Sequence, residues 1–114
     1  MTQMPLCKVY GHVYPLSEAL YAALEAAMSG CMGQETDDPA LLREGDMARV
    51  SFEGIHFPEE EVIAALRTHL TPAMQGKLDC LDLENWRLTR YRFEGGEVRT
   101  SAAPLNNVLD FSGH

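Results

Sequence analysis

The chain has 114 residues, with 17 Asp and Glu against 9 Lys and Arg, and its formal net charge is −8. This length fits one domain, and a hydrophobic fraction of 46% supports a single core and excludes global disorder. The acidic balance repels nucleic acid and anionic membrane at long range and attracts basic partners.

The chain begins with a predicted strand followed by a helix. Leu6–Tyr14 is rich in β-branched and aromatic residues, and Gly11 within it indicates a bulge or a close approach of another backbone. Ser17–Met28 is predicted to be a helix, because a serine can cap its first turn and leucines and a methionine recur every four positions.

The middle of the chain predicts a loop, a helical turn, a hairpin and a second helix. Gly30–Pro39 has the composition of a loop, and Ala40–Arg43 is predicted to form one helical turn. Met47–Phe57 has two β-rich arms around Glu53-Gly54, which predicts a hairpin. Pro58–Leu70 is predicted to be a helix, because proline suits the first helical position and three glutamates follow it.

The clearest β signal lies near the end of the chain. Leu78–Leu83 alternates apolar and polar residues, as a short strand does. Trp86–Phe93 and Glu97–Ser101 flank a pair of glycines, which supply the positive φ angles of a tight hairpin turn. Leu105–Phe111 is expected to form a helical turn or a strand that covers a sheet edge.

Together these elements predict an α+β fold. We expect a mostly antiparallel sheet, built from two hairpins plus an N-terminal strand, with two helices packed on one face. Residues 1–114 are expected to form a single α+β domain. Arg49–Gly54 and Arg90–Gly95 share the pattern R-x-x-F-E-G, which we interpret as two hairpins with the same turn chemistry. An open sheet edge would also allow a homodimer.

Cysteine usage points to a reducing compartment. Cys7, Cys31 and Cys80 cannot all pair within one chain, and the sequence has no C-x-x-C. It shows no signal peptide and no apolar stretch long enough for a membrane span. We therefore expect a cytoplasmic protein with free thiols and no membrane association. The nearest pair of soft ligands, Cys7 and His12, lacks a second pair to complete a zinc site, so we expect no metal and no cofactor.

A small thiol enzyme is one alternative function. It would use Cys80 as its nucleophile, with His56 or His69 as the base and Asp79 or Asp82 as the orienting acid. A buried structural thiol explains the same cysteine without any chemistry. The sequence holds no G-x-S-x-G, H-E-x-x-H or phosphate-binding loop, which removes the easily recognised enzyme classes but does not exclude an enzyme.

Binding of RNA or single-stranded DNA is the other alternative. The strand that opens the last hairpin interleaves aromatic planes for base stacking with guanidinium groups for phosphates. The residues predicted to bind nucleic acid there are Trp86, Arg87, Arg90, Tyr91 and Arg92. The overall negative field of the protein opposes this function.

The preferred function follows from the distribution of the acids. Residues 1–64 hold eleven acids and three bases, whereas residues 65–114 hold six of each. Carboxylates can imitate a phosphate backbone and dock on a basic groove, although they can also serve solubility alone. We predict a non-catalytic protein that docks on a basic protein surface, in one version as a phage or mobile-element inhibitor of a nucleic-acid-handling complex. The predicted contacts are Asp37, Asp38, Glu59, Glu60 and Glu61.

Overall fold

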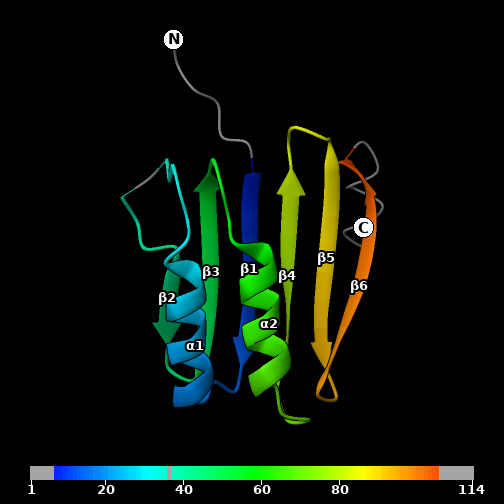
Figure 1. The fold of residues 1–114 in the computed structure, drawn as a ribbon. Coiled ribbons are helices and arrows are strands. Elements are labelled where there is room, and N and C mark those ends of the chain that lie inside the picture. Colours follow the sequence, from blue (N-terminus) through cyan, green and yellow to red (C-terminus); the bar gives the residue numbers. More distant parts are fainter. Residues whose placement is uncertain (1–6, 36, 106–114) are drawn as a thin grey trace.

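One antiparallel sheet, covered on one face by two helices, organises the molecule (Figure 1). The computed structural model describes residues 7–35 and 37–105. In chain order the elements are β1 (Cys7–Tyr14), α1 (Glu18–Met28), β2 (Leu41–Glu44), β3 (Met47–Gly54), α2 (Glu59–His69), β4 (Gln75–Asp82), β5 (Arg87–Glu94) and β6 (Glu97–Pro104). The predicted α+β fold, with both helices on the same face of the sheet, is confirmed.

The strands are ordered β2-β3-β1-β4-β5-β6, so β1 lies inside the sheet between β3 and β4. The first six elements follow the βαββαβ order of the split βαβ motif. The hairpin of β5 and β6 then extends the sheet beyond β4. Within the described residues, the edge strands are therefore β2, with four residues, and β6, with eight.

The helices form as their sequences predict, because each has one apolar stripe to bury. Ser17 caps α1 by accepting a hydrogen bond from the backbone N–H of Leu20 at 3.1 Å. The buried side chains of α1 are Leu20, Leu24 and Met28, and those of α2 are Val62, Ile63 and Leu66. These stripes pack with the inner side chains of the sheet into one hydrophobic cluster. Each fully buried leucine contributes roughly 1.5–3 kcal/mol.

Gly11 marks a close approach between neighbouring strands, as predicted, and the pairing of β1 runs through it without a bulge. A Cβ atom at Gly11 would lie 2.3 Å from the carbonyl oxygen of Lys77 and 2.8 Å from the Cα of Leu78. Any side chain at this position would therefore push β1 and β4 apart.

The last predicted hairpin is confirmed. β5 and β6 pair from Arg87 opposite Pro104 to Glu94 opposite Glu97. The turn uses Gly95 at φ 62° and Gly96 at φ 80°, conformations that L side chains rarely adopt. The short strand predicted at Leu78–Leu83 is also present, within the longer β4. Of the predicted C-terminal segment, only Leu105 lies inside the described residues.

Two predictions for the middle of the chain are wrong. The expected helical turn at Ala40–Arg43 is instead strand β2, which pairs with β3 around the positive-φ Gly45. The expected hairpin within Met47–Phe57 does not form, since β3 continues through Glu53 to Gly54.

The reason lies in the role of Gly54. A Cβ atom there would lie 2.6 Å from the carbonyl oxygen of Gly33 and 2.6 Å from the ring of Phe52. Glycine is therefore required at position 54 because of a close contact with the backbone of Gly33 and the ring of Phe52, and not because the chain reverses there. The two R-x-x-F-E-G segments accordingly differ in structure, because only the second one leads into a turn.

Candidate functional site: the two sides of the sheet

Alternate residues of each strand face opposite sides of the sheet. The side covered by α1 and α2 is called the helix side below, and the other side is called the open face. Pairing register places most of the bases on the open face. They are Lys8, Arg49, Lys77, Arg90, Arg92 and Arg99, which are six of the nine Lys and Arg residues of the chain.

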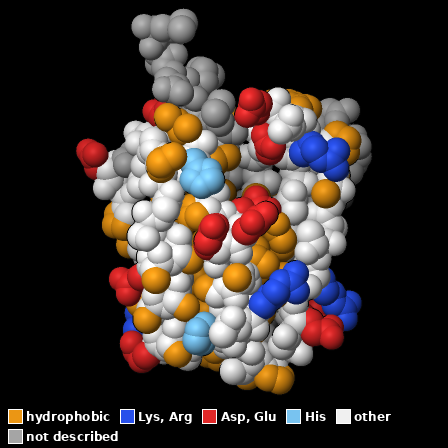
Figure 2. Space-filling view, in the orientation of Figure 1, with side chains coloured by type: hydrophobic (Ala, Val, Ile, Leu, Met, Phe, Trp, Pro, Cys, Tyr) orange, Lys and Arg blue, Asp and Glu red, His pale blue; other side chains and the backbone are white. Residues whose placement is uncertain are grey.

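Five acids of the strands lie among these bases on the open face: Glu44, Glu53, Asp79, Glu94 and Glu97. Another group of acids lies on the helix side, at the end of the molecule where α2 begins. Figure 2 shows carboxylates bordering a hollow in the upper half of this side. The hollow is a cleft of about 400 Å³ whose acidic lining residues are Glu59, Asp82 and Glu84. Glu60 and Glu61 are exposed next to it in the first turn of α2. This surface, consisting of Glu59, Glu60, Glu61, Asp82 and Glu84, is called the acidic end.

The loop after α1 is held at the same end. An isolated bridge joins Met32 to His56, and the backbone N–H of Glu35 donates to the carbonyl oxygen of Glu53 at 2.8 Å. Asp37 and Asp38 follow in this loop and are exposed. Two of the predicted partner contacts thus come from a loop beside the end of β3, and the other three come from the start of α2.

Glu59 differs from its two neighbours. Its side chain is half-buried and accepts a hydrogen bond from the hydroxyl of Tyr91. Burial, and then this hydrogen bond to Glu59, raises the pKa of Tyr91. Glu59 therefore supports the packing of α2 on β5 as well as contributing charge, whereas Glu60 and Glu61 are available to a partner.

Asp82 and Glu84 were not predicted as partner contacts. Asp82 caps the turn between β4 and β5 by accepting hydrogen bonds from the backbone N–H groups of Glu84 and Asn85, at 3.1 and 3.0 Å. The side chain of Asn85 also donates to Asp82 at 2.8 Å, and this bond is the main reason that the pKa of Asp82 is lowered. The sequence signal was the pair of acids at the end of β4, but only the fold places them beside α2.

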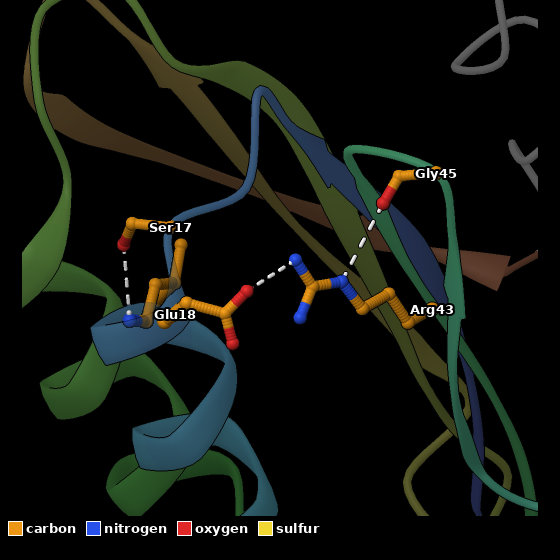
Figure 3. Close-up of polar contacts among 5 residues, drawn as sticks. Ser17, Glu18, Arg43 and Gly45 are labelled. Atoms are coloured by element: carbon orange, nitrogen blue, oxygen red, sulfur yellow. Dashed lines mark hydrogen bonds and ion pairs between the residues drawn. The ribbon is translucent and has the colours of Figure 1, made fainter.

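One helix-side base is already neutralised. Arg43 reaches from β2 to Glu18 at the start of α1, with an N–O distance of 2.6 Å, and its Nε donates to the carbonyl oxygen of Gly45 at 3.4 Å (Figure 3). The guanidinium also lies 5.5 Å from the centre of the Tyr21 ring. This contact fixes the start of α1 to the β2–β3 hairpin. Arg67 and Arg87 are the other bases on this side, and both are exposed.

The structure does not favour the thiol enzyme. Cys80, Cys7, His56 and Asp82 do line the same cleft. However, Cys80 is only 6% exposed, and burial, followed by the negative charge of Glu59, raises the pKa of its thiol. No hydrogen bond joins His56 to Cys80 within the described part of the chain. A protonated, buried thiol is a poor nucleophile.

The other proposed partners of Cys80 lie elsewhere. His69 is the last residue of α2, whereas the cleft lies at the first turn of that helix, about 15 Å away along the axis at 1.5 Å per residue. Asp79 faces the opposite side of the sheet, where it binds Arg90 through two bonds of 2.7 and 3.0 Å. Neither residue can assist a reaction in the cleft.

The described residues also offer no evident metal centre. Cys7 and His12 face opposite sides of β1, because an odd number of positions separates them. Among residues 7–35 and 37–105, no group of three or more His, Cys, Asp or Glu is placed to hold a metal ion.

The predicted nucleic-acid strand is divided between the two sides. Tyr91 faces the helix side, while Arg90 and Arg92 face the open face. Arg90 is only 5% exposed and is bound to Asp79. Trp86 precedes β5 and is 56% exposed, and Arg87 lines the acidic cleft. These five residues do not share one surface.

The sequence analysis missed a different group of aromatic residues. Tyr10 and Tyr14 are exposed on the open face of β1, on either side of His12. The only available signal was the alternation Tyr-x-His-x-Tyr within the first strand. It passed unnoticed because a strand alone does not reveal which of its faces a helix will cover.

Comparisons with known proteins place no constraint on function. Neither a protein-family model, nor a curated protein, nor a solved structure matches the chain. Within the described residues, no helix is long and apolar enough to cross a membrane.

Proposed function

We propose that this is a non-catalytic interaction protein whose acidic end docks on a basic surface of a partner protein. The observation that supports it is the cleft of about 400 Å³ at the start of α2, which is lined by carboxylates from both α2 and the β4–β5 turn. Two segments far apart in sequence thus present negative charge to the same space. Complementary charge of this kind speeds association and selects the partner.

The cleft suits a lysine or arginine side chain. Its lining combines apolar side chains, among them Val9, Ile55 and Phe57, with the carboxylates of Asp82 and Glu84. The aliphatic stem of a basic residue can pack on the apolar part while its charged head meets the carboxylates. Cys7 and Cys80 stay protonated, since burial raises the pKa of both thiols, so they add no competing charge. Arg87 also lines the cleft and offsets part of its negative charge.

The narrower proposals rest on composition. An inhibitor of a nucleic-acid-handling complex, of the kind that phages and mobile elements encode, fits a chain of 114 residues with a net charge of −8. A cytoplasmic location fits the free thiols of Cys7, Cys31 and Cys80. Self-association would use a sheet edge, and β6 offers a longer edge than β2.

A charge-reversal pair tests the docking surface. Glu60→Lys/Glu61→Lys changes two exposed residues of the acidic end and leaves Glu59 bound to Tyr91. The matched control is Glu94→Lys/Glu97→Lys, which makes the same change of charge at the exposed β5–β6 turn. Binding of a fluorescein-labelled oligo-arginine peptide would be followed by anisotropy, and capture of partners from the source cell would be repeated with the same variants.

We expect the first variant to weaken peptide binding by about tenfold, which corresponds to about 1.4 kcal/mol, and to lose the captured partner. The control should bind nearly as well as the original protein. Equal losses in both variants would show that only net charge matters, and unchanged binding in the first variant would remove the acidic end from consideration.

A further inference from the structure

A row of basic residues crosses the open face from strand to strand. Arg49 of β3 lies opposite His12 of β1, which lies opposite Lys77 of β4. Lys77 in turn lies opposite Arg92 of β5, and Arg92 lies opposite Arg99 of β6. These five residues are called the basic row. Neighbouring strands are about 4.8 Å apart, so the row spans about 19 Å.

This arrangement works against the stability of the sheet. Directly opposed residues have Cβ atoms about 5 Å apart, and like charges in such positions repel. Carboxylates beside the row compensate only in part. Arg49, Lys77 and Arg99 make ion pairs with Glu44, Asp79 and Glu97, at 3.3, 3.5 and 3.9 Å.

These ion pairs are easily exchanged for another anion. The side chains of Arg49, Lys77 and Arg99 are 54%, 44% and 70% exposed, and exposed pairs are weak. Arg92 is exposed and makes no ion pair with the described part of the chain. A ligand with several regularly spaced negative charges would relieve the repulsion among Lys77, Arg92 and Arg99, which are directly opposed across β4, β5 and β6.

Aromatic rings stand on both sides of the row. Tyr10 and Tyr14 precede and follow His12 by two residues on the same face of β1, and they are 37% and 36% exposed. The rings of His12 and Tyr14 are stacked, with centroids 6.0 Å apart and planes inclined by 22°. The hydroxyl of Tyr10 donates to Glu53 at 3.0 Å, which holds that ring in place.

The rings and the row share one depression. It has a volume of about 490 Å³, and Tyr10, Tyr14, His12, Arg49 and Lys77 are among the residues that line it. Anchored aromatic planes beside phosphate-binding cations are the two elements that proteins combine to hold single strands. A duplex cannot use the rings, because its bases are already stacked on one another.

We propose that the open face binds single-stranded nucleic acid, with the basic row contacting phosphates and Tyr10 and Tyr14 stacking on bases. This site is independent of the acidic end, which lies on the other side of the sheet. Five carboxylates of the strands share the open face. Glu44, Glu53, Asp79 and Glu97 are each engaged with a base or with Tyr10. Glu94, two residues after Arg92 on β5, makes no ion pair within the described part of the chain and offsets part of the positive charge of the row. Contacts between the basic row and phosphates release counterions, so these contacts are strongest at low salt. The net charge of −8 opposes the approach of nucleic acid from a distance.

The test uses fluorescence anisotropy of a fluorescein-labelled oligo-dT of about 15 nucleotides, a length that covers one or more sites of the usual size for single-strand binding. We expect saturable binding at low salt, at least about tenfold weaker binding of a duplex of the same length, and a log–log salt slope near −3, or about −0.7 for each of four phosphates. No saturable binding at low salt would overturn the proposal. Equal binding of the duplex would also overturn it, because the rings would then play no part.

Matched variants locate the site. Arg92→Glu should weaken binding by about tenfold and flatten the salt slope by about 0.7. Arg67→Glu is the control, because Arg67 is an exposed base on the helix side and the change of charge is the same. Equal losses of binding in the two variants would show that the overall charge of the protein, and not the basic row, determines the affinity. Thermal unfolding by circular dichroism would confirm the fold, and Arg99→Gln would replace Arg92→Glu if that variant failed to fold.

The rings need a test of their own. Tyr14→Ala should weaken the binding of oligo-dT about fivefold or more, whereas Tyr14→Phe, which keeps the stacking plane, should bind nearly normally. Inorganic polyphosphate serves as the competitor without bases. If polyphosphate competes as well as an unlabelled oligonucleotide and Tyr14→Ala has no effect, the face is a general anion site and the proposal fails.

Discussion

The two sides of the sheet are built from alternate residues of the same strands, yet they differ in charge. The helix side presents carboxylates from α2 and the β4–β5 turn around a cleft. The open face presents six of the nine basic side chains of the chain, five of them in β1, β3, β4 and β5, interspersed with five carboxylates of the described strands. The net charge of −8 is therefore an average over two unlike surfaces. The net charge alone therefore does not describe either surface.

The two sides also differ in how far their ion pairs are exposed to solvent. On the helix side, the ion pair of Arg43 with Glu18 involves a carboxylate side chain that is 82% exposed. On the open face, Arg90 is 5% exposed and binds Asp79 through two bonds. Screening by water and salt weakens the first pair far more than the second.

The largest effect on stability should come from breaking the buried pair. Asp79→Ala removes the carboxylate that accepts two hydrogen bonds from Arg90, and a hydrogen-bonded contact with a charged group contributes about 1.5–3 kcal/mol. Urea unfolding would measure the change in the free energy of unfolding.

The control is Glu53→Ala. Glu53 pairs with Lys8 on the same face at 3.6 Å and accepts a hydrogen bond from Tyr10, but its side chain is 36% exposed, and an exposed ion pair is worth about 0–1 kcal/mol. Similar small effects in both variants would mean that the open face has no buried electrostatic contact, and the contrast between the two sides would be lost.

A smaller effect should follow from Asp82→Ala at the acidic end. The variant removes the acceptor of three hydrogen bonds in the β4–β5 turn and should lower the free energy of unfolding by about 1 kcal/mol. Because the pKa of Asp82 is lowered in the folded state, its contribution is present above the ordinary aspartate pKa and is lost as the pH falls through the folded value.

Unfolding curves of Asp82→Ala and of the original protein should therefore converge in acid. Asp82→Asn keeps one acceptor oxygen and separates the loss of the cap from the loss of the charge. If the difference between the original protein and Asp82→Ala were constant across the acid range, Asp82 would not carry a lowered pKa.

The smallest effect should come from Glu18→Gln. Hydrogen bonding to Arg43 lowers the pKa of Glu18, so its contribution is present above the ordinary glutamate pKa and is lost as the pH falls through the folded value. Both groups are at the surface, and we expect a urea midpoint close to that of the original protein, with no difference at high salt. A large, salt-independent change would show that the contact in Figure 3 anchors α1 more strongly than an exposed pair does.

Local sequence patterns were sufficient for several elements. The capping serine and the apolar stripe determine α1, and the paired glycines at 95 and 96 determine the last hairpin. They fail at β2 and β3, where the partner of each strand is not decided locally. Gly54 resembled a turn residue, but glycine is needed there because a side chain would collide with the backbone of Gly33, which is distant in the sequence.

The sequence by itself determined both helices, the last hairpin, the α+β class and the excess of acids before residue 65. Only the tertiary structure decided which side of each strand meets the helices, and with it the position of every charge. Residues 12, 49, 77, 92 and 99 have no common spacing along the chain, and they form one row because pairing between distant strands sets their register. Strand pairing is long-range, so a surface assembled across strands cannot be read from any local stretch of sequence.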